Sequence, residues 1–412
     1  MAYNIAYIVP RFPSLYQTYI ANELADLTQR GFSTHVFSLK KPRTPTNHGT
    51  TASSDDHAYY TPYLLSARLL YSQIYFLVRH PFIYLSTLAS LAGHNYRHPL
   101  TLLKAVAAFP KTVHYARVMQ TYAVDHIHAH WATIPALSAL VIFRLTGIPY
   151  SLTAHAIDIF NNGSMLSEKI SNARFVLTCN DYSRLYLLRS FPTLDSGKVT
   201  ALYHGVDLEV FRPRPAEPDP PFKILSVGRM EPSKGFPYLL QACAQLRSRH
   251  IPFECTLIGD GPDEHALRQL IAKLGLGDHV ILHPPVPYKE IPQYYALSHL
   301  FVLPAVSACH WGIPNVLIEA MAVGVPVITT PLPAIPELVR HRVNGTIVPE
   351  KDPLALANAM QELIQLPDLR RRFAQHARAV VEELFDRRRT SAILADRFER
   401  CPSREGHAPL RS

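Results

Sequence analysis

The sequence predicts an α/β protein with two doubly wound parallel sheets. Strand-like apolar runs alternate with helix-like segments along almost the whole chain, and a Pro-rich stretch divides this alternation into two parts of similar pattern. Strands that alternate with helices are typical of parallel sheets covered by helices on both faces. A chain of 412 residues is also long for one hydrophobic core, so two domains are expected.

The first part opens with a βαβ unit: a strand at 3–9, a helix at 14–30 and a strand at 33–39. Two long apolar-rich helices, within 59–93 and 99–122, are predicted as an insertion after the second strand. Further strands are expected at 126–129, 150–153, 175–178 and 199–202, and helices at 134–146 and 181–191.

Residues 212–221, Arg-Pro-Arg-Pro-Ala-Glu-Pro-Asp-Pro-Pro, predict a stiff extended linker, because proline removes backbone donors and fixes φ. It separates an N-terminal domain at 1–211 from a C-terminal domain at 222–375, and 376–412 is predicted as a helix that returns to the first domain, with a tail. Strands of the second domain are expected at 223–227, 254–258, 280–282, 300–303, 325–329 and 345–348, and helices at 235–249, 263–274, 290–297, 314–323 and 353–365.

Composition limits the class of protein. A net charge of +9 and a pI near 9.2 favour anionic partners, but no compact Lys/Arg stripe with interleaved aromatics indicates nucleic acid. The five scattered cysteines lack a C-x-x-C pair and predict reduced thiols in a cytoplasmic protein. We expect no signal peptide, and the apolar runs at 69–78 and 82–93 are too short to span a bilayer.

Two cations indicate a phosphate site in the second part. Arg229 and Lys234 lie in Val-Gly-Arg-Met-Glu-Pro-Ser-Lys-Gly, a strand end and tight turn before a helix. Fixed cations and a helix N-terminus suit a diphosphate, although a surface Arg and Lys on a turn would look the same. The order is not a Walker loop, because no Gly precedes Lys234 and no Ser or Thr follows it.

A second motif, Gly-Ile-Pro-Asn-Val-Leu-Ile-Glu-Ala-Met-Ala from Gly312, predicts a loop, a helix that begins near Pro314 and one carboxylate, Glu319. This carboxylate could accept hydrogen bonds from ribose hydroxyls; the alternative is a solvated helix carboxylate. The turn at Gly259 and Asp260 would let the backbone approach a nucleotide.

In the first part, His155 and Asp158 directly follow a predicted strand, where an imidazole can bond a sugar hydroxyl or pass a proton. His126, His128 and His130 alternate at strand period and so share one face. We favour a structural role over a metal site for these three, because no matching Cys, Asp or Glu lies nearby in sequence. Asp-x-Asp is absent, and no metal or other cofactor is expected.

Taken together, these segments resemble family 4 of the retaining glycosyltransferases with the GT-B fold, in its colanic-acid and exopolysaccharide branch. The resemblance covers nearly the whole chain, and the order and spacing of the segments make it specific. They are Arg11-Phe-Pro-Ser-Leu-Tyr-Gln-Thr-Tyr-Ile20, Phe37-Ser-Leu39, His126-Ile-His-Ala-His-Trp131, Thr153-Ala-His-Ala-Ile-Asp-Ile-Phe160 and His204-Gly-Val-Asp-Leu-Glu-Val-Phe-Arg-Pro213.

The resemblance implies two facing Rossmann-like domains, with the acceptor on the first and a nucleotide-sugar on the second. It implies that Arg229 and Lys234 hold the diphosphate, Glu319 the ribose, and His155 the transferred sugar, while the backbone at Val286 lies near the base. Catalytic roles then fall to Arg229, Lys234 and His155. The donor would contact Arg229, Lys234, Gly259, Asp260, Val286, Trp311, Gly312, Ile313, Pro314, Asn315 and Glu319, and the acceptor side would include Ser14, His155 and Asp158.

The sequence departs from the family at Trp311, where an acidic residue usually contacts the donor sugar. Three interpretations follow: an altered donor with the ring stacked on the sugar, a weakened enzyme, or a binding protein that has lost catalysis. His310 is a candidate substitute polar group. The usual Gly-Gly after the first strand is replaced by Arg11-Phe-Pro-Ser14, where Ser14 could cap the following helix.

The sequence therefore predicts a metal-independent hexosyltransferase that uses a nucleoside-diphosphate sugar and a saccharide or lipid-linked acceptor. The alternative is a nucleotide-sugar sensor or complex subunit, and another GT-B enzyme such as an epimerase fits the first segments less well. Peripheral contact of the helices around 63–120 with an anionic membrane is a separate hypothesis; the alternative is that they only cover the first sheet.

Overall fold

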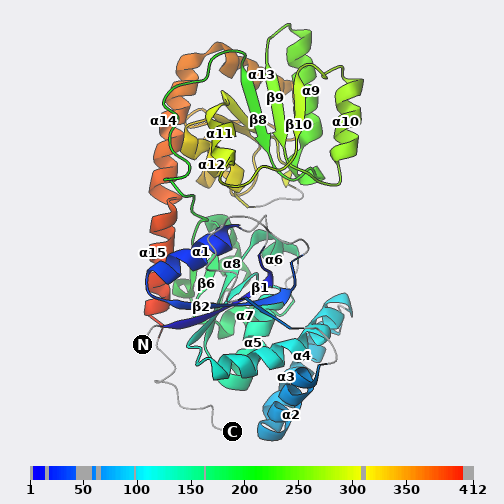
Figure 1. Ribbon diagram of the computed structural model, residues 1–412, viewed down its shortest axis with the longest axis vertical. Coiled ribbons are helices and arrows are strands. Elements are labelled where there is room, and N and C mark those ends of the chain that lie inside the picture. The colour runs from blue at the N-terminus through cyan, green and yellow to red at the C-terminus, as the bar shows by residue number, and fades with distance from the viewer. Residues whose placement is uncertain are drawn as a thin grey trace. The chain divides into compact units, whose positions relative to one another are not determined.

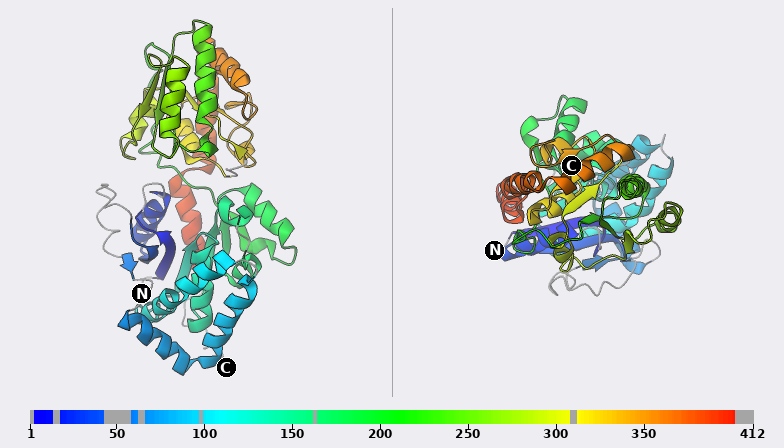
Figure 2. Two further views of the ribbon diagram at one scale, coloured as in Figure 1. Left: turned by 90° about the vertical axis from the view of Figure 1, so that its right-hand side faces the viewer. Right: turned by 90° about the horizontal axis from the view of Figure 1, so that it is seen from above.

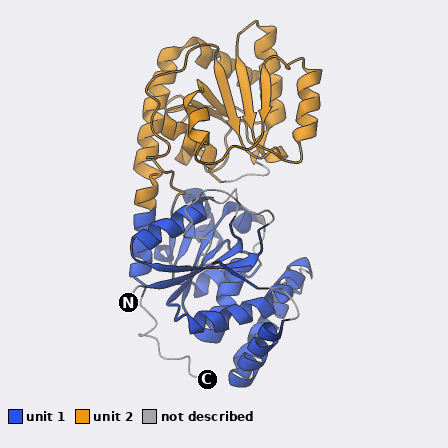
Figure 3. Cartoon of the chain, viewed as in Figure 1, with its two compact units in different colours: residues 1–202, 391–412 blue, residues 203–390 orange. Residues whose placement is uncertain are grey.

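The computed structural model describes residues 3–13, 18–42, 58–61, 66–96, 99–161, 164–307 and 312–401. The chain divides into two compact units, one made of residues 1–202 with 391–412 and the other of 203–390 (Figure 3). Each unit holds one parallel sheet with helices around it, so the predicted fold class of two Rossmann-like parallel-sheet domains is confirmed.

Among the described residues, the first unit has a seven-stranded sheet in the order β3-β2-β1-β4-β5-β6-β7 (Figure 1). Ile5 to Val9 of β1 are completely buried, as expected for a central parallel strand covered on both faces. The order reverses between β1 and β4, and ligands of doubly wound sheets bind outside the carboxyl ends of strands at such a point. The strands are β1 (Asn4–Arg11), β2 (Ser33–Lys40), β3 (Ala58–Tyr60), β4 (His126–His130), β5 (Tyr150–Ala154), β6 (Val176–Thr178) and β7 (Val199–Ala201).

The helices of the first unit include the expected α1, α4, α5 and α8, and two short helices, α6 and α7, that the sequence did not predict. α5 begins and ends at the predicted residues and closes at Gly147, whose φ of 73° suits a glycine. The helices are α1 (Thr18–Gln29), α2 (Ala67–Arg79), α3 (Pro81–Asn95), α4 (Pro99–Thr121), α5 (Ile134–Thr146), α6 (Ala156–Asn161), α7 (Leu166–Asn172) and α8 (Asp181–Ser190).

The single helix predicted within 59–93 is wrong. Residues 58–60 form β3 beside β2, and the rest forms two helices, α2 and α3, with a bend of 113° between them. The break falls at His80, which leaves helical geometry with φ −140° and ψ 60°, directly before Pro81. Proline disfavours helical geometry in the residue before it and is itself suited to the first helical position, so one helix ends and another begins there.

The second unit has a six-stranded parallel sheet among its described residues, in the order β10-β9-β8-β11-β12-β13 (Figure 1). Its strands are β8 (Lys223–Val227), β9 (Glu254–Ile258), β10 (Val280–His283), β11 (Leu300–Leu303), β12 (Val327–Thr329) and β13 (Thr346–Ile347). Its helices are α9 (Phe236–Ser248), α10 (Glu264–Lys273), α11 (Ile291–Ala296), α12 (Asn315–Val323), α13 (Pro353–Gln365) and α14 (Pro367–Leu384). The order reverses between β8 and β11, so the loops after these strands are the expected ligand edge.

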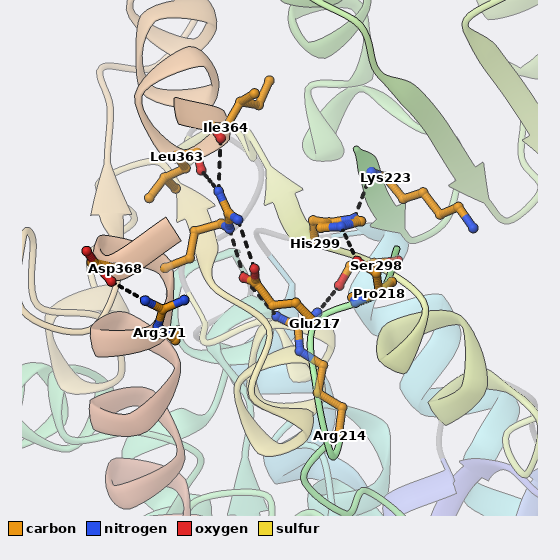
Figure 4. A network of polar contacts seen from close by, with 11 residues as sticks. Arg214, Glu217, Pro218, Lys223, Ser298, His299, Leu363, Ile364, Asp368 and Arg371 are labelled. Carbon is orange, nitrogen blue, oxygen red and sulfur yellow. Dashed lines mark hydrogen bonds and ion pairs between the residues drawn. The ribbon is translucent and has the colours of Figure 1, made fainter. Parts of the chain in front are cut away.

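The Pro-rich segment 212–221 has no helix or strand, and it lies within the second unit. Figure 4 shows the polar network around it. Glu217 accepts two hydrogen bonds of 2.8 Å from the guanidinium of Arg370 on α14, and Arg214 donates to the Ser298 carbonyl. His299 reaches the Pro218 carbonyl through Nε2 (2.8 Å). A bidentate Arg–carboxylate pair fixes geometry as well as charge, so this segment is bound along the second unit.

The C-terminal helix α15 (Arg387–Glu399) returns to the first unit from Ser391 onward. Leu394, Ala395 and Phe398 are buried in a core cluster of that unit with Phe32 and Phe175. Phe398 also packs edge-on against His126, with ring centroids 5.4 Å apart. The predicted helix that crosses back to the first domain is therefore present.

Candidate functional site

The loop between β8 and α9 carries the two predicted cations. It continues through a single 3-10 turn, Pro232–Lys234, and ends at Gly235, which has φ 68°. A Cβ on Gly235 would lie 1.9 Å from the Pro304 carbonyl oxygen, so only glycine permits this close approach. Lys234 lies along Gly228 with its Cδ and Cε, and burial lowers the pKa of its ammonium, an effect that Glu231 opposes.

Arg229 differs from Lys234 in exposure. Its side chain is 55% exposed, and its Nη1 lies 3.6 Å from Glu231 Oε2. Glu231 in turn accepts a 2.7 Å hydrogen bond from Ser233 Oγ. An exposed ion pair of this length contributes little stability, so Arg229 can exchange Glu231 for a ligand anion at small cost.

The turn after β9 packs against this loop. The Met230 N–H donates to the Asp260 carbonyl (2.6 Å), and the Asp263 N–H donates to the Met230 carbonyl (3.0 Å). A Cβ on Gly259 would lie 2.0 Å from the Gly228 carbonyl oxygen, and one on Gly261 2.3 Å from that of Met230. These two glycines are therefore required by contact between two protein loops. Contact of this turn with a nucleotide stays a prediction.

The helix α12 provides the other half of the predicted site. It begins after Pro314, and no side chain caps its N-terminus among the described residues. Glu319 accepts a 2.8 Å hydrogen bond from Tyr295 Oη through Oε2. Burial raises the pKa of the Glu319 carboxyl to about 7, although the Tyr295 bond acts in the opposite direction. The carboxyl is thus poised to change charge near neutral pH.

The loop after β11 joins these parts. The Val306 N–H donates to the Ser233 carbonyl (3.0 Å), next to the contact between Gly235 and Pro304. Ser307 N–H donates to Glu350 Oε2 at 3.0 Å. We call the loop that carries Arg229 and Lys234 the cation loop. The structure thus holds it between the turn after β9 and the start of the loop that leads to α12. Trp311 lies outside the described residues, whereas Gly312, Ile313 and Asn315 are partly exposed and Val286 packs against the core.

In the first unit, His155 and Trp131 form an aromatic stack at the carboxyl ends of β5 and β4. The ring centroids are 4.7 Å apart and the planes differ by 20°. Trp131 has φ 75°, which is unusual for a bulky residue and is held by its N–H bond to the Thr153 carbonyl (2.9 Å). Tyr19 of α1 lies 5.9 Å from the His155 ring. Ser14 falls outside the described residues.

Asp158 is buried, with 1% of its surface exposed. Its Oδ2 accepts hydrogen bonds from the backbone N–H of Ala132 (2.8 Å) and of His155 (3.2 Å). Burial raises the pKa of this carboxyl to about 7, against the effect of those bonds and of Lys169. Asp158 thus connects the loops after β4 and β5, and its carboxylate points into the protein interior.

The three alternating histidines of β4 are buried. His126 and His128 share the Ser151 hydroxyl at 2.8 and 2.7 Å, and His128 also reaches Thr153 Oγ1 at 3.0 Å. Burial lowers the pKa of His126 to about 3. One ligand atom each from Glu23, His128 and His130 lies within 4.8 Å of the others. However, both nitrogens of His128 already bond hydroxyls, which favours the structural role.

Sequence reasoning gave no function to Trp131 or Tyr295. Trp131 follows β4 as His155 follows β5, and this equivalent position on adjacent parallel strands was the available signal. Tyr295 lies on α11, and nothing in its local sequence indicates a hydrogen bond to Glu319, 24 residues later.

Comparison with known proteins defines the class of protein. Residues 16–210 match Glycosyltransferase Family 4 and residues 207–380 match Glycosyl transferases group 1. The fold is similar to that of the Anabaena protein HepE, whose crystal structure contains UDP, with a TM-score of 0.70, 18% identity and coverage of 96% of this chain and 99% of that one. The two family matches, together with this fold, thus define a GT-B glycosyltransferase.

The chain belongs to glycosyltransferase family 4. It is 28% identical over 419 residues to the putative colanic acid biosynthesis glycosyltransferase WcaL of Escherichia coli K12, which covers 95% of this chain and 98% of the relative. It is 38% identical over 183 residues to the amylovoran biosynthesis glycosyltransferase AmsK of Erwinia amylovora. This match covers 44% of this chain and 45% of the relative. The expected likeness to the exopolysaccharide branch is confirmed.

Proposed function

We propose that this protein transfers a hexose from a nucleoside-diphosphate sugar to a saccharide or lipid-linked acceptor, with retention of configuration and without a metal, in surface polysaccharide or glycolipid biosynthesis. The observation that carries the proposal is the cation loop of Arg229 and Lys234, held beside the loop that leads to α12. The crystal structure of HepE with UDP-glucose supports a nucleotide-sugar as the donor. The names of WcaL and AmsK, glycosyltransferases of colanic acid and amylovoran biosynthesis, support a role in surface polysaccharide biosynthesis.

The proposed reaction needs no protein nucleophile. The acceptor hydroxyl attacks the anomeric carbon on the face from which the diphosphate leaves, the C1–O bond to the phosphate breaks, and the hydroxyl proton passes to the departing phosphate. Negative charge grows on the diphosphate in the transition state, where Lys234, Arg229 and the N-terminus of α12 stabilise it more than in the ground state. His155 contacts the transferred sugar. We place the reaction in the cytoplasm, with the acceptor at the inner face of the cytoplasmic membrane.

The experiment is a screen of purified protein against nucleotide-sugars with and without EDTA. Diphosphate release reports turnover, and ligand-induced melting shifts report binding. Metal-independent release with one donor is expected. Release that EDTA abolishes would overturn the metal-independent part of the proposal, and a product of inverted configuration would overturn retention.

The second candidate is a nucleotide-sugar-binding protein without catalysis, and the observation that favours it is Trp311 in place of the usual acidic residue. It predicts a melting shift without diphosphate release. The substitution Trp311→Glu separates the two: a gain of turnover indicates decay of an enzyme, whereas a loss indicates a Trp that serves the present donor.

A further inference from the structure

The helices α2, α3 and the first turns of α4 expose an unusual amount of apolar surface. Eleven of the 23 exposed large apolar side chains among the described residues lie between 70 and 106, which concentrates them on one part of the first unit. They are Leu70, Tyr71, Ile74, Leu77, Val78, Phe82, Leu85, Tyr96, Leu100, Leu103 and Val106. We call these residues the apolar surface. Patches of this kind mark interaction sites.

These side chains are on the outer faces of their helices. α2 packs on α4, and α3 packs on α4 and α5 (Figures 1 and 2). The inward row of α2 is Leu69, Ser72 and Phe76, whereas Leu70, Ile74 and Val78 form an outward row at the spacing of one helix face. In an ordinary surface helix that outward row is polar. The exposed fractions reach 76% at Val78, 87% at Phe82 and 73% at Leu100.

The charge of this region has one sign. Residues 58–124 contain no Asp or Glu, although 67 residues would carry about five at the chain's average of 32 in 412. Arg68, Arg79 and Lys104 are exposed on the same helices. Two further cations contact other groups of the protein: Lys111 donates to the Leu39 carbonyl, and Arg117 lies over the Tyr71 ring. Apolar side chains with exposed cations and no acids suit an anionic lipid surface.

The geometry indicates contact with a bilayer surface rather than a span. No single described helix is long and apolar enough to cross a membrane, and α2 and α3 meet such a test only as a pair, bent by 113°. The 13 residues of α2 extend about 20 Å at a rise of about 1.5 Å per residue, against a hydrocarbon core of about 30 Å.

A second copy of this chain fits the apolar surface less well. In a two-fold dimer the same patch meets itself, so Arg68, Arg79 and Lys104 would face their own copies or each other. Since 58–124 supplies no carboxylate to pair with them, such a dimer would bury repulsive charges. An anionic bilayer supplies the opposite charge and takes up the apolar side chains.

We infer that α2, α3 and the start of α4 form a peripheral docking surface for an anionic lipid bilayer. This deepens the proposed function by naming where the membrane binds, and it rests on that proposal only for the location of the acceptor.

The test is co-sedimentation of the full chain with vesicles of phosphatidylcholine alone and with 30% phosphatidylglycerol. We expect binding to the anionic vesicles that falls with added salt. The variant Val78→Ser/Phe82→Ser/Leu100→Ser should lower the partition coefficient at least tenfold. Its control, Ile281→Ser/Leu297→Ser/Leu354→Ser, changes three apolar residues of the second unit whose side chains are also more than half exposed, and it should bind as the parent does.

A second variant keeps the test decisive if the triple variant fails to fold. Arg79→Gln with Lys104→Gln should weaken binding about 25-fold, since one cation near an anionic surface contributes about fivefold. Parent protein that does not bind anionic vesicles at low salt, or a control that loses binding equally, overturns the inference. So does a concentration-dependent dimer that the triple variant dissociates without any vesicle binding.

Diphosphate release in detergent-free solution, with water as acceptor, separates this inference from the proposed function. The docking variants should release diphosphate at the parent rate, because none of their residues belongs to the candidate site. A protein that releases diphosphate but ignores vesicles contradicts only the docking surface. One that docks but never releases diphosphate contradicts only the transferase proposal.

Discussion

At the carboxyl edge of the first sheet, a Trp ring stacks on the imidazole of His155, with the buried histidines of β4 beneath. At the corresponding edge of the second sheet, Lys234 and Arg229 lie in a loop held by glycine contacts. This edge also includes Glu319 and the N-terminus of α12, which no side chain of the described residues caps. The two sheets share a fold and differ in charge. Aromatic faces suit an uncharged sugar ring, whereas cations and helix N–H groups suit a diphosphate. This difference is why we propose that the second unit binds the donor.

The largest expected effect comes from the cation of the second edge. Lys234→Ala should lower turnover about 100- to 1000-fold, the range for loss of one preorganised group that stabilises transition-state charge. Diphosphate release under saturating donor measures it. The matched control Lys273→Ala removes an exposed lysine of α10 and should leave turnover unchanged. A folded Lys234→Ala protein with full turnover would remove Lys234 from the mechanism.

The next effect tests the first edge. Trp131→Ala should lower kcat about tenfold, because His155 loses a stacked partner worth up to about 1.5 kcal/mol, while the Kd for UDP stays within about twofold of the parent. Trp131→Phe, which retains a ring, should recover most of the loss. Calorimetric titration with UDP and turnover measurements together test whether kcat falls while the affinity for UDP is unchanged. A parallel loss of UDP affinity would show that the two edges are not separate in role.

The pH dependence of nucleotide binding tests Glu319. The ionised carboxylate is the form that accepts hydrogen bonds from two ribose hydroxyls. With a pKa of about 7, lowering the pH from 7.5 to 6.0 should weaken UDP binding about eightfold as the carboxylate protonates. Titration calorimetry at both pH values measures this, and Glu319→Gln should flatten the profile. In the unliganded protein, stability depends on pH in the opposite direction. Because the folded-state pKa of Glu319 is raised, the free energy of unfolding falls as pH rises from 4.5 toward 7.

The last effect is on stability rather than on turnover or binding, and it concerns the histidines beneath the first edge. The pKa of His126 falls from 6.5 to about 3 on burial, so its contribution to stability is present above pH 6.5 and is lost as pH falls toward 3. Between pH 6.5 and 5 this amounts to about 2 kcal/mol. Denaturant titrations at the two pH values should therefore show a smaller pH-dependent change in His126→Asn than in the parent. An equal change in both proteins would contradict a buried neutral imidazole.

Local pattern predicted most of the fold. The spans of α5, α13, β8, β9 and β11 match the expected ones, because each is a regular apolar run with a clear stop such as Gly147. The single helix expected within 59–93 is wrong because Pro81 ends one helix at the residue before it and begins another. The packing of 212–221 depends on Arg370, 153 residues after Glu217, and no local rule could reveal it.

The candidate site could be predicted only in part for the same reason. Arg229 and Lys234 follow a strand, and Glu319 lies within a helix that begins after Pro314, all of which sequence shows directly. The bond from Tyr295 to Glu319, the strained backbone of Trp131 and the inward direction of Asp158 are tertiary facts. Sequence spacing placed Asp158 beside His155 correctly, but the fold directs its carboxylate to the backbone N–H groups of two loops.

The most direct measurement is a crystal structure of the full chain with UDP. We expect the diphosphate within hydrogen-bond distance of the Lys234 ammonium and the Arg229 guanidinium, and the ribose against Glu319. A diphosphate bound elsewhere, with Lys234 still lying along Gly228 and no phosphate oxygen near it, would contradict the account.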